Sequence, residues 1–202
     1  MFYRRFGKRA FDIVWAVVAL LVLSPLLCTI ALAIKLTSHG SVFYVHERVG
    51  KGGVPFPFIK FRTMVDGSDQ QQHMLEHLNE VEGPVFKIKN DPRVTRVGRL
   101  LRRFSIDELP QLVNVLKGDM SLVGPRPLPV RDVERIELQW HKRRFSIRPG
   151  ITCLWQVNGR SNIGFDDWVR MDLDYIDKWS LGLDLLILMK TIPAVFKGPG
   201  AY

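Results

Sequence analysis

The longest apolar run of the chain lies near its amino-terminus. Residues 13–34 contain no charged side chain, and only Ser24, Pro25 and Thr29 interrupt their apolar character. A helix of 22 residues is long enough to cross the roughly 30 Å hydrocarbon core of a bilayer. We therefore expect this run to form a membrane-embedded helix.

Basic flanks and a central proline bear on the topology of this run. Positive side chains mark the cytoplasmic side of a membrane, and here they occur on both flanks: Arg4, Arg5, Lys8, Arg9, Lys35, Arg48 and Lys51. Proline removes a backbone donor and bends a helix. Both features favour a re-entrant hairpin that breaks at Ser24-Pro25, although a kinked transmembrane span stays open. A cleaved signal peptide fits less well, because the apolar region is longer than the usual one.

Two elements are predicted after the apolar run. Strand-like residues dominate 41–63, and Gly50, Gly52 and Gly53 supply turn conformations between them, which predicts a β-hairpin. Arginines recur at helical spacing over residues 96–103, which predicts a helix with one basic face. That face is either solvated, in contact with anionic headgroups, or part of a phosphate site.

Two later segments are less regular. Residues 118–127 are rich in glycine and proline and are expected to form a loop. Residues 181–197 form a second apolar stretch, which is too short to span a bilayer. Together with Trp168 and Trp179 it suits a surface that lies in the membrane interface, and an ordinary core helix is the competing interpretation.

The charge balance constrains the partners. The 202 residues carry 29 basic and 20 acidic side chains, a net charge of +9. Such an excess indicates an anionic partner, and no nucleic-acid-binding motif accompanies it, so we expect lipid or a phosphorylated substrate and no nucleic acid. A hydrophobic fraction of 47% excludes a disordered chain. The two cysteines, Cys28 and Cys153, are too few for a disulfide framework or a zinc site.

Two adjacent carboxylates, Asp107 and Glu108, directly follow the basic segment. One interpretation is structural, because Ser105 and Glu108 fit a capping box at a helix start. The other is chemical: an aspartate can attack phosphorus to form an acyl phosphate, and magnesium is normally held by one or two carboxylates. Asp107 is thus a candidate nucleophile or metal ligand, beside arginines that can bind phosphate bidentately.

Three further arginines lie beside glycine or proline. Arg126 stands between two prolines, Arg148 precedes a Pro-Gly pair, and Arg160 follows a glycine. A stiff backbone suits a preorganised anion contact, although each segment also fits a rigid surface loop. Together they predict a site for a substrate with several phosphate charges.

Four segments of the chain resemble one family. The runs KRAFDIVWAVVALLVLSPL, KFRTM, SIDELPQLVNVLKGDMSLVGPRP and RPGITCLWQVNGR resemble the bacterial sugar transferases, which are monotopic polyprenyl-phosphate phosphoglycosyl transferases. The resemblance extends from about Arg9 to Tyr202, and the order of its DELPQ, KGDMS and GPRP blocks is highly specific.

The resemblance implies a reaction. Such enzymes move a sugar 1-phosphate from a UDP-sugar to undecaprenyl phosphate, release UMP, and initiate the assembly of an exopolysaccharide, O-antigen or other glycan. The implied mechanism is ping-pong, with magnesium and a phosphosugar carried on Asp107, and with Glu108 as the second member of the catalytic dyad. The matching basic and acidic positions, expected to bind substrate, are Lys60, Arg62, Arg102, Arg126, Arg148, Arg160 and Asp172.

The resemblance also implies an architecture and a location. We expect a mixed α/β, mainly helical monotopic membrane protein with interfacial amphipathic helices and a small β-hairpin or sheet. Residues 1–40 would form the re-entrant membrane helix with its break at Ser24 and Pro25, and residues 41–202 the catalytic domain on the cytoplasmic face of the bacterial inner membrane. The donor would be a UDP-sugar, with glucose or galactose favoured, and the acceptor undecaprenyl phosphate. No feature demands a homodimer, which stays open.

Two positions depart from the family pattern. Cys153 stands where a glycine is expected, and Ser41 replaces an expected proline, but neither belongs to the dyad. The ending GPGAY resembles longer members that carry additional amino-terminal membrane helices, so the chain is either a naturally short form or a catalytic domain. Two alternatives to phosphosugar transfer remain: a non-catalytic membrane-anchored module that binds anionic lipid, and a glycosyltransferase that releases UDP.

Overall fold

The computed structural model describes residues 3, 7–80, 83–86, 88–136, 138–159 and 163–197. Its α-helices are α1 (Lys8–Thr37), α2 (Arg96–Arg103), α3 (Gln111–Lys117), α4 (Val130–Glu134), α5 (Leu154–Asn158), α6 (Phe165–Lys178) and α7 (Leu181–Lys197). Its strands are β1 (Phe43–Val49), β2 (Pro55–Phe61), β3 (Ser121–Val123), β4 (Leu128–Pro129) and β5 (Gly150–Thr152). Short 3-10 helices are η2 (Lys51–Gly53), η3 (His73–Leu78), η4 (Ile106–Glu108) and η5 (Gln139–Ser146). The fold is therefore mixed α/β and mainly helical, as expected.

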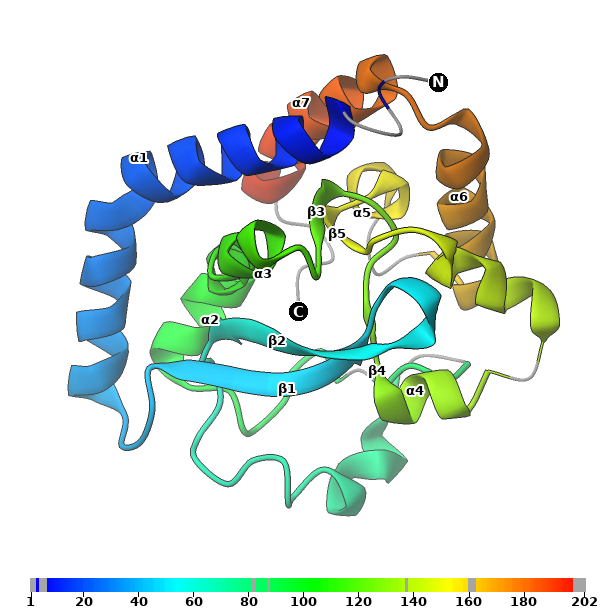
Figure 1. Ribbon diagram of the computed structural model, residues 1–202. Helices are drawn as coiled ribbons and strands as arrows, with labels where there is room; N and C mark the ends of the chain where they lie inside the picture. The colour runs from blue at the N-terminus through cyan, green and yellow to red at the C-terminus, as the bar shows by residue number, and fades with distance from the viewer. Residues whose placement is uncertain are drawn as a thin grey trace.

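The predicted β-hairpin is confirmed and forms the larger sheet. Strands β1 and β2 are antiparallel, with Phe43 opposite Phe61 and Val49 opposite Pro55, and β4 pairs with the other edge of β1. Gly52 and Gly53 have φ angles of 73° and 80°, which a side chain rarely adopts, so glycine is required in this turn. Figure 1 shows the long hairpin crossing the front of the molecule below α3.

Part of the segment expected to be a loop is a strand. Within residues 118–127, β3 pairs in parallel with β5 in a second, two-stranded sheet. The two backbones approach so closely that a Cβ atom at Gly124 would lie 2.6 Å from the carbonyl oxygen of Arg148. The strands are short and their partners are distant in sequence, so no local periodicity reveals them.

Helix α1 contains the apolar run and is bent. Figure 1 shows it as two arms that meet at an angle, with the first arm above α3 and the second descending beside β1 and α2. Over the described residues it is the helix that is long and apolar enough to cross a membrane, and only 11% of its apolar window is buried in the protein.

At Ser24 and Pro25, a side-chain hydrogen bond replaces the backbone hydrogen bond that proline cannot make. Pro25 has no N–H to donate to the carbonyl of Leu21, which a straight helix would require. The hydroxyl of Ser24 donates to that carbonyl instead, at 2.8 Å. This bond satisfies the carbonyl that Pro25 leaves free, so α1 bends near Pro25 and continues as one helix to Thr37.

Both arms of α1 pack against the same domain. In the first arm, Ala16 is fully buried in a core with Val115 and Ile187. In the second arm, Ile30 and Ile34 pack with Phe61 and Leu101. The two ends of the apolar helix thus lie against one body of protein.

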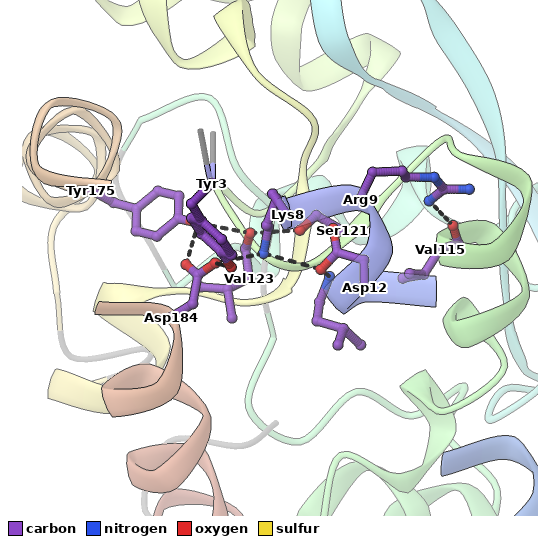
Figure 2. A network of polar contacts seen from close by, with 10 residues as sticks. Tyr3, Lys8, Arg9, Asp12, Val115, Ser121, Val123, Tyr175 and Asp184 are labelled. Carbon is purple, nitrogen blue, oxygen red and sulfur yellow. Dashed lines mark hydrogen bonds and ion pairs between the residues drawn. The ribbon is translucent and has the colours of Figure 1, made fainter. Parts of the chain in front are cut away.

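The first turn of α1 is fixed by a buried polar network. Lys8 is only 6% exposed and lies 3.1 Å from Asp12 and 2.8 Å from Asp184 of α7. The hydroxyl of Tyr175 donates to Asp184 at 2.7 Å, and Tyr3 contacts the other oxygen of that carboxylate. Figure 2 shows these side chains converging between α1, α6 and α7. We call Lys8, Asp12, Tyr175 and Asp184 the anchor cluster.

The basic flank that was expected to mark the cytoplasmic side is partly internal to the protein. Besides Lys8, Arg9 donates from its guanidinium to the carbonyl oxygens of Val115 and Leu116, at 2.6 and 2.9 Å. These cations hold α1 against α3 and α7.

The second apolar stretch forms helix α7, which carries apolar side chains on its inner side and on its outer side. Its inner side contributes the fully buried Ile187 to the core, while an outer stripe stays exposed: Leu181, Leu185, Met189, Ile192 and Phe196. The expectation that Trp168 lies at a membrane interface is wrong, because it is only 6% exposed and its ring packs 4.3 Å from that of Trp155.

Candidate active site

The two adjacent carboxylates lie in η4, in the connection between α2 and α3. The capping box does not form, because Ser105 makes no side-chain cap and Glu108 binds an arginine instead. Ser105 has a φ angle of 53°, the only left-handed value among the described residues other than glycine. Such strain persists only where surrounding contacts impose it. Here it belongs to the sharp turn that presents Asp107 and Glu108.

A cavity of about 590 Å³ opens at this turn. It brings together residues that are far apart in sequence: Lys60, Arg62, Arg102, Asp107, Glu108 and Arg126 all line it. Strand β2 supplies Lys60, α2 supplies Arg102, and the loop after β3 supplies Arg126. Six of the nine candidate catalytic or substrate-binding residues thus share one site.

Glu108 and Arg126 form a bidentate ion pair. Nη1 of Arg126 donates to Oε2 of Glu108 at 2.9 Å, and Nη2 contacts Oε1. Burial alone would raise the pKa of Glu108, but the charge and hydrogen bonds of Arg126 outweigh it and keep that pKa below its usual value. Glu108 is therefore ionised at neutral pH, and Arg126 already contacts both of its carboxylate oxygens.

Asp107 has the opposite environment. It is 7% exposed and makes no hydrogen bond with a described side chain. Burial, followed by the neighbouring charge of Glu108, raises the pKa of Asp107 to about 6, despite the attraction of Lys60 and Arg102. Near neutral pH it is an ionised carboxylate with a free lone pair, which is the state that a nucleophile or metal ligand requires.

The cations around this carboxylate are incompletely paired. Lys60 and Arg102 form no ion pair with a described residue, and Arg102 donates from Nε to the hydroxyl of Thr63 at 2.9 Å. Burial and the nearby Arg102 lower the pKa of Lys60 to about 8. Arg62 donates from Nη2 to Ser38 at the end of α1, whereas its buried Nε and Nη1 have no described partner. Buried donors without acceptors indicate an anionic ligand.

Sequence reasoning missed two lining residues, Arg48 and His46. The sequence pattern identifies Arg48 only as part of a basic flank and indicates no role for His46. Both lie on β1 and line the same cavity as Asp107. The alternation of β1 is the signal that could have found them, because Tyr44, His46 and Arg48 share one face of the strand.

Two predicted residues do not line the cavity. Arg148 donates from Nε to the carbonyl oxygen of Gly118 at 2.8 Å and is exposed. Asp172 is 1% exposed and forms an ion pair with Arg144 at 2.6 Å. Arg144 also donates to the carbonyl oxygen of Arg126 at 2.8 Å, so Asp172 supports the loop that carries Arg126. Arg160 lies outside the described residues.

A divalent cation is compatible with these residues but would not be enclosed by them. Over the described part of the chain, no group of three or more His, Cys, Asp or Glu side chains is placed to hold a metal ion. Asp107 offers a carboxylate to which no described residue donates a hydrogen bond, whereas Glu108 is engaged by Arg126. Magnesium is commonly bound by one or two carboxylates together with substrate phosphates, and this donor set fits that pattern.

Comparison with known proteins adds independent information. The family model described as bacterial sugar transferase matches residues 3–198. The chain is 44% identical to the exopolysaccharide production protein ExoY of Rhizobium meliloti, over 97% of this chain and 88% of that protein. It is 45% identical to the undecaprenyl-phosphate galactose phosphotransferase of Salmonella typhimurium, over 98% of this chain and 42% of that protein.

A third relative has a different sugar in its name. The chain is 42% identical to the UDP-glucose:undecaprenyl-phosphate glucose-1-phosphate transferase of Caulobacter vibrioides, over 96% of this chain and 72% of that protein. The chain therefore spans most of some relatives and less than half of others.

Proposed function

Because this chain belongs to the bacterial sugar transferase family, we propose that it transfers a sugar 1-phosphate from a UDP-sugar to undecaprenyl phosphate and releases UMP. The observation that carries the proposal is the cavity around Asp107. A buried carboxylate that has no hydrogen-bond partner among the described residues faces cations that exceed the local acids. This suits attack on a phosphate group that carries several negative charges.

The first half-reaction begins at Asp107. A carboxylate oxygen of Asp107 attacks the phosphorus that carries the sugar, and a new oxygen–phosphorus bond forms. The bond between that phosphorus and the bridging oxygen breaks, and UMP departs with the electron pair. The products are UMP and a phosphosugar bound to Asp107.

The second half-reaction regenerates the carboxylate. A phosphate oxygen of undecaprenyl phosphate attacks the same phosphorus, and the bond to Asp107 breaks. The product is an undecaprenyl diphosphate sugar, and Asp107 returns to its ionised state. One cation-lined cavity serves both steps, because donor and acceptor phosphates occupy it in turn.

The remaining cavity residues have electrostatic roles in this proposal. Lys60, Arg62 and Arg102 would bind phosphate oxygens, while Glu108 fixes the guanidinium of Arg126. Arg126 would face charge that develops on the transferred phosphate. Arg160 remains a predicted substrate-binding residue. Arg148 lies outside the cavity lining, so we expect only a small contribution from it. The position of Asp172 favours an indirect contribution through Arg144 and Arg126.

We further propose that Asp107 is a protein ligand of Mg²⁺, with substrate phosphate oxygens and water completing the coordination. When bound, the ion would neutralise phosphate charge and favour the ionised form of Asp107.

The membrane arrangement is part of the proposal. Both arms of α1 pack on one domain and basic residues flank both ends, so we propose a re-entrant helix on the cytoplasmic face of the inner membrane. The exposed apolar stripe of α7 would lie in the lipid interface beside α1. The phosphate of the lipid acceptor would then lie at the depth of the cavity.

Topology has its own test. In a Cys28→Ser background, single cysteines replace the exposed Ala10 and His39 at the two ends of α1. A membrane-impermeant thiol reagent applied to sealed vesicles of known orientation should label both positions from the same side. Labelling from opposite sides would refute the re-entrant arrangement.

The reaction is tested by identifying the released nucleotide. Detergent-solubilised protein is incubated with Mg²⁺, undecaprenyl phosphate and a panel of UDP-sugars that includes UDP-glucose and UDP-galactose. Acceptor-dependent UMP supports phosphosugar transfer, and the responding donor identifies the sugar that enters exopolysaccharide or O-antigen assembly. Release of UDP would place the reaction at the sugar carbon. Absence of both products from folded protein would favour a module that binds anionic lipid.

A further inference from the structure

Arg48 is a half-buried cation that has no role in the proposed reaction so far. Its side chain lies on the same face of β1 as Tyr44 and His46, and all three line the cavity that contains Asp107. Among the described residues, its guanidinium contacts three neutral groups. Nε donates to Nε2 of His46 at 2.9 Å, Nη1 donates to the carbonyl oxygen of Pro127 at 2.7 Å, and the ring of Phe58 lies 4.1 Å away.

These contacts orient Arg48 without neutralising it. No carboxylate of a described residue forms an ion pair with it, and Nη2 has no described hydrogen-bond partner. Burial and the nearby Arg126 lower the pKa of Arg48 to about 9. The nearby carboxylates therefore do not offset the cost of this positive charge. A fixed, uncompensated guanidinium on a cavity wall is suited to bind an anion.

His46 determines how the guanidinium is held. Arginine cannot accept a hydrogen bond, so Nε2 of His46 must be unprotonated and the ring proton must lie on Nδ1. Burial and the charges of Arg48 and Lys60 lower the pKa of His46 to about 2, so the ring stays neutral throughout the physiological range. Nδ1 is buried and has no described partner. The imidazole thus acts as a constant acceptor for Arg48.

Arg48 also shares a backbone support with Arg126. The carbonyl that accepts from Arg48 belongs to Pro127, the residue that follows Arg126. One loop therefore fixes both guanidinium groups, and within the described part of the chain Arg126 has a carboxylate partner whereas Arg48 has none. The second cation is left for the substrate.

We propose that Arg48 binds a phosphate group of the substrate and that His46 is the positioning residue that holds its guanidinium. The inference rests on the proposed phosphosugar transfer. The phosphate belongs either to the donor or to the lipid acceptor, and the two half-reactions separate these sources.

The test of Arg48 compares Arg48→Gln with Arg143→Gln, a matched loss of an arginine that pairs with Asp177 on the surface. UMP release is measured with donor alone in a single turnover, and then with varied acceptor at saturating donor. Arg48→Gln should lower kcat/KM by about 10- to 100-fold for the substrate whose phosphate it binds. A defect confined to the single turnover assigns the donor, and one confined to the acceptor series assigns the lipid phosphate.

Equilibrium binding keeps the two proposals distinguishable. Calorimetric titration with UMP and with inorganic pyrophosphate requires no turnover. If wild-type protein releases no UMP, the proposed reaction fails, yet weaker binding of these probes to Arg48→Gln would still support the anion site. Equal kcat/KM values and equal affinities in Arg48→Gln and wild type would overturn the role of Arg48.

The role of His46 is tested by restoring or removing its acceptor. His46→Gln retains a side-chain oxygen that can accept from Nε of Arg48, whereas His46→Leu does not. His46→Leu should show a defect in the same half-reaction as Arg48→Gln, and His46→Gln should recover to within about threefold of wild type. Equal defects in both variants, at equal melting temperatures, would overturn the positioning role.

Discussion

The protein buries two clusters of charged side chains, and they differ in how their charge is balanced. In the anchor cluster, one lysine faces two aspartates, and tyrosine hydroxyls and a backbone N–H supply further donors. Around Asp107 and Glu108, the described cations Lys60, Arg48, Arg102 and Arg126 act on two carboxylates, and of these four Arg126 alone is paired with a described carboxylate. The charged groups of the anchor cluster contact one another (Figure 2), whereas those around Asp107 line a cavity.

This difference separates a structural cluster from a chemical one. A buried ionic network with satisfied partners holds elements together, here α1, α6 and α7. Surplus cations beside an unpaired carboxylate disfavour the folded state and require a ligand to complete them. Burial alone therefore does not identify an active site, and the balance of charge and hydrogen bonds has to be examined.

The largest effect is expected for Asp107→Asn. The amide cannot act as the nucleophile, so turnover should fall by about 10⁴-fold or more. Acceptor-dependent UMP release measures this loss, with Arg143→Gln as the control for surface charge. Turnover by Asp107→Asn within tenfold of wild type would contradict the nucleophile assignment.

The same variant should not lose stability. The folded state raises the pKa of Asp107 from 3.8 to about 6, so it prefers the protonated form. The resulting stabilisation is complete below pH 3.8 and is lost as the pH rises to about 6. Asn mimics the neutral form, so Asp107→Asn should melt at a higher temperature than wild type at pH 7.5, and this gain should vanish near pH 4.

The anchor cluster should respond in the opposite way. Asp184→Asn removes one of the two negative charges that face the buried ammonium of Lys8, and it replaces a carboxylate oxygen with an N–H₂ donor. We expect a loss of about 3 kcal/mol in the free energy of unfolding, measured with denaturant, and a kcat within twofold of wild type for the folded fraction. A reduced kcat at unchanged stability would contradict the division between the two clusters.

The pH dependence of kcat/KM for the donor should show an effect of intermediate size, and it reports on the cavity residues without the anchor cluster. In a ping-pong reaction, kcat/KM for the donor reports the first half-reaction, which excludes ionisation of the lipid phosphate. Activity should rise as Asp107 ionises near pH 6 and fall as Lys60 loses its proton near pH 8, by about tenfold per unit on each limb. Lys60→Arg should move the alkaline limb upward, and an unmoved limb would exclude Lys60 as its origin.

The smallest effect is expected at Arg148. Its side chain is exposed and donates to a backbone carbonyl outside the cavity. Arg148→Gln should therefore change kcat/KM for either substrate by less than about threefold. A loss comparable with that of a cavity arginine would show that the substrate extends beyond the cavity lining.

Local patterns predicted the local features correctly. Strand-like residues and glycine placement predicted the β-hairpin, and arginine spacing predicted α2. The family blocks predicted that Lys60, Arg102 and Arg126 accompany the dyad, and the structure places them in one cavity. These features depend on short segments or on recognisable runs of sequence.

The features that were missed depend on long-range contacts. The sequence places Lys8 in a basic flank on the cytoplasmic side, and its burial is not predicted because its partner Asp184 lies at the other end of the chain. The pairing of β3 with β5 involves two strands of three residues each. The orientation of the Arg48 guanidinium depends on its contacts with His46 and with the carbonyl oxygen of Pro127, which is distant in sequence. Such relations are set by tertiary packing and have no local signature.

Trapping the covalent intermediate tests the central claim most directly. Protein is mixed with Mg²⁺ and the donor identified above, in the absence of undecaprenyl phosphate, and is then quenched in acid for intact-mass and peptide analysis. We predict about one equivalent of UMP and a mass increase of one sugar phosphate on the peptide that contains Asp107, absent from Asp107→Asn. UMP release without any protein adduct, or an adduct that persists in Asp107→Asn, would contradict the claim that this cavity performs the chemistry through Asp107.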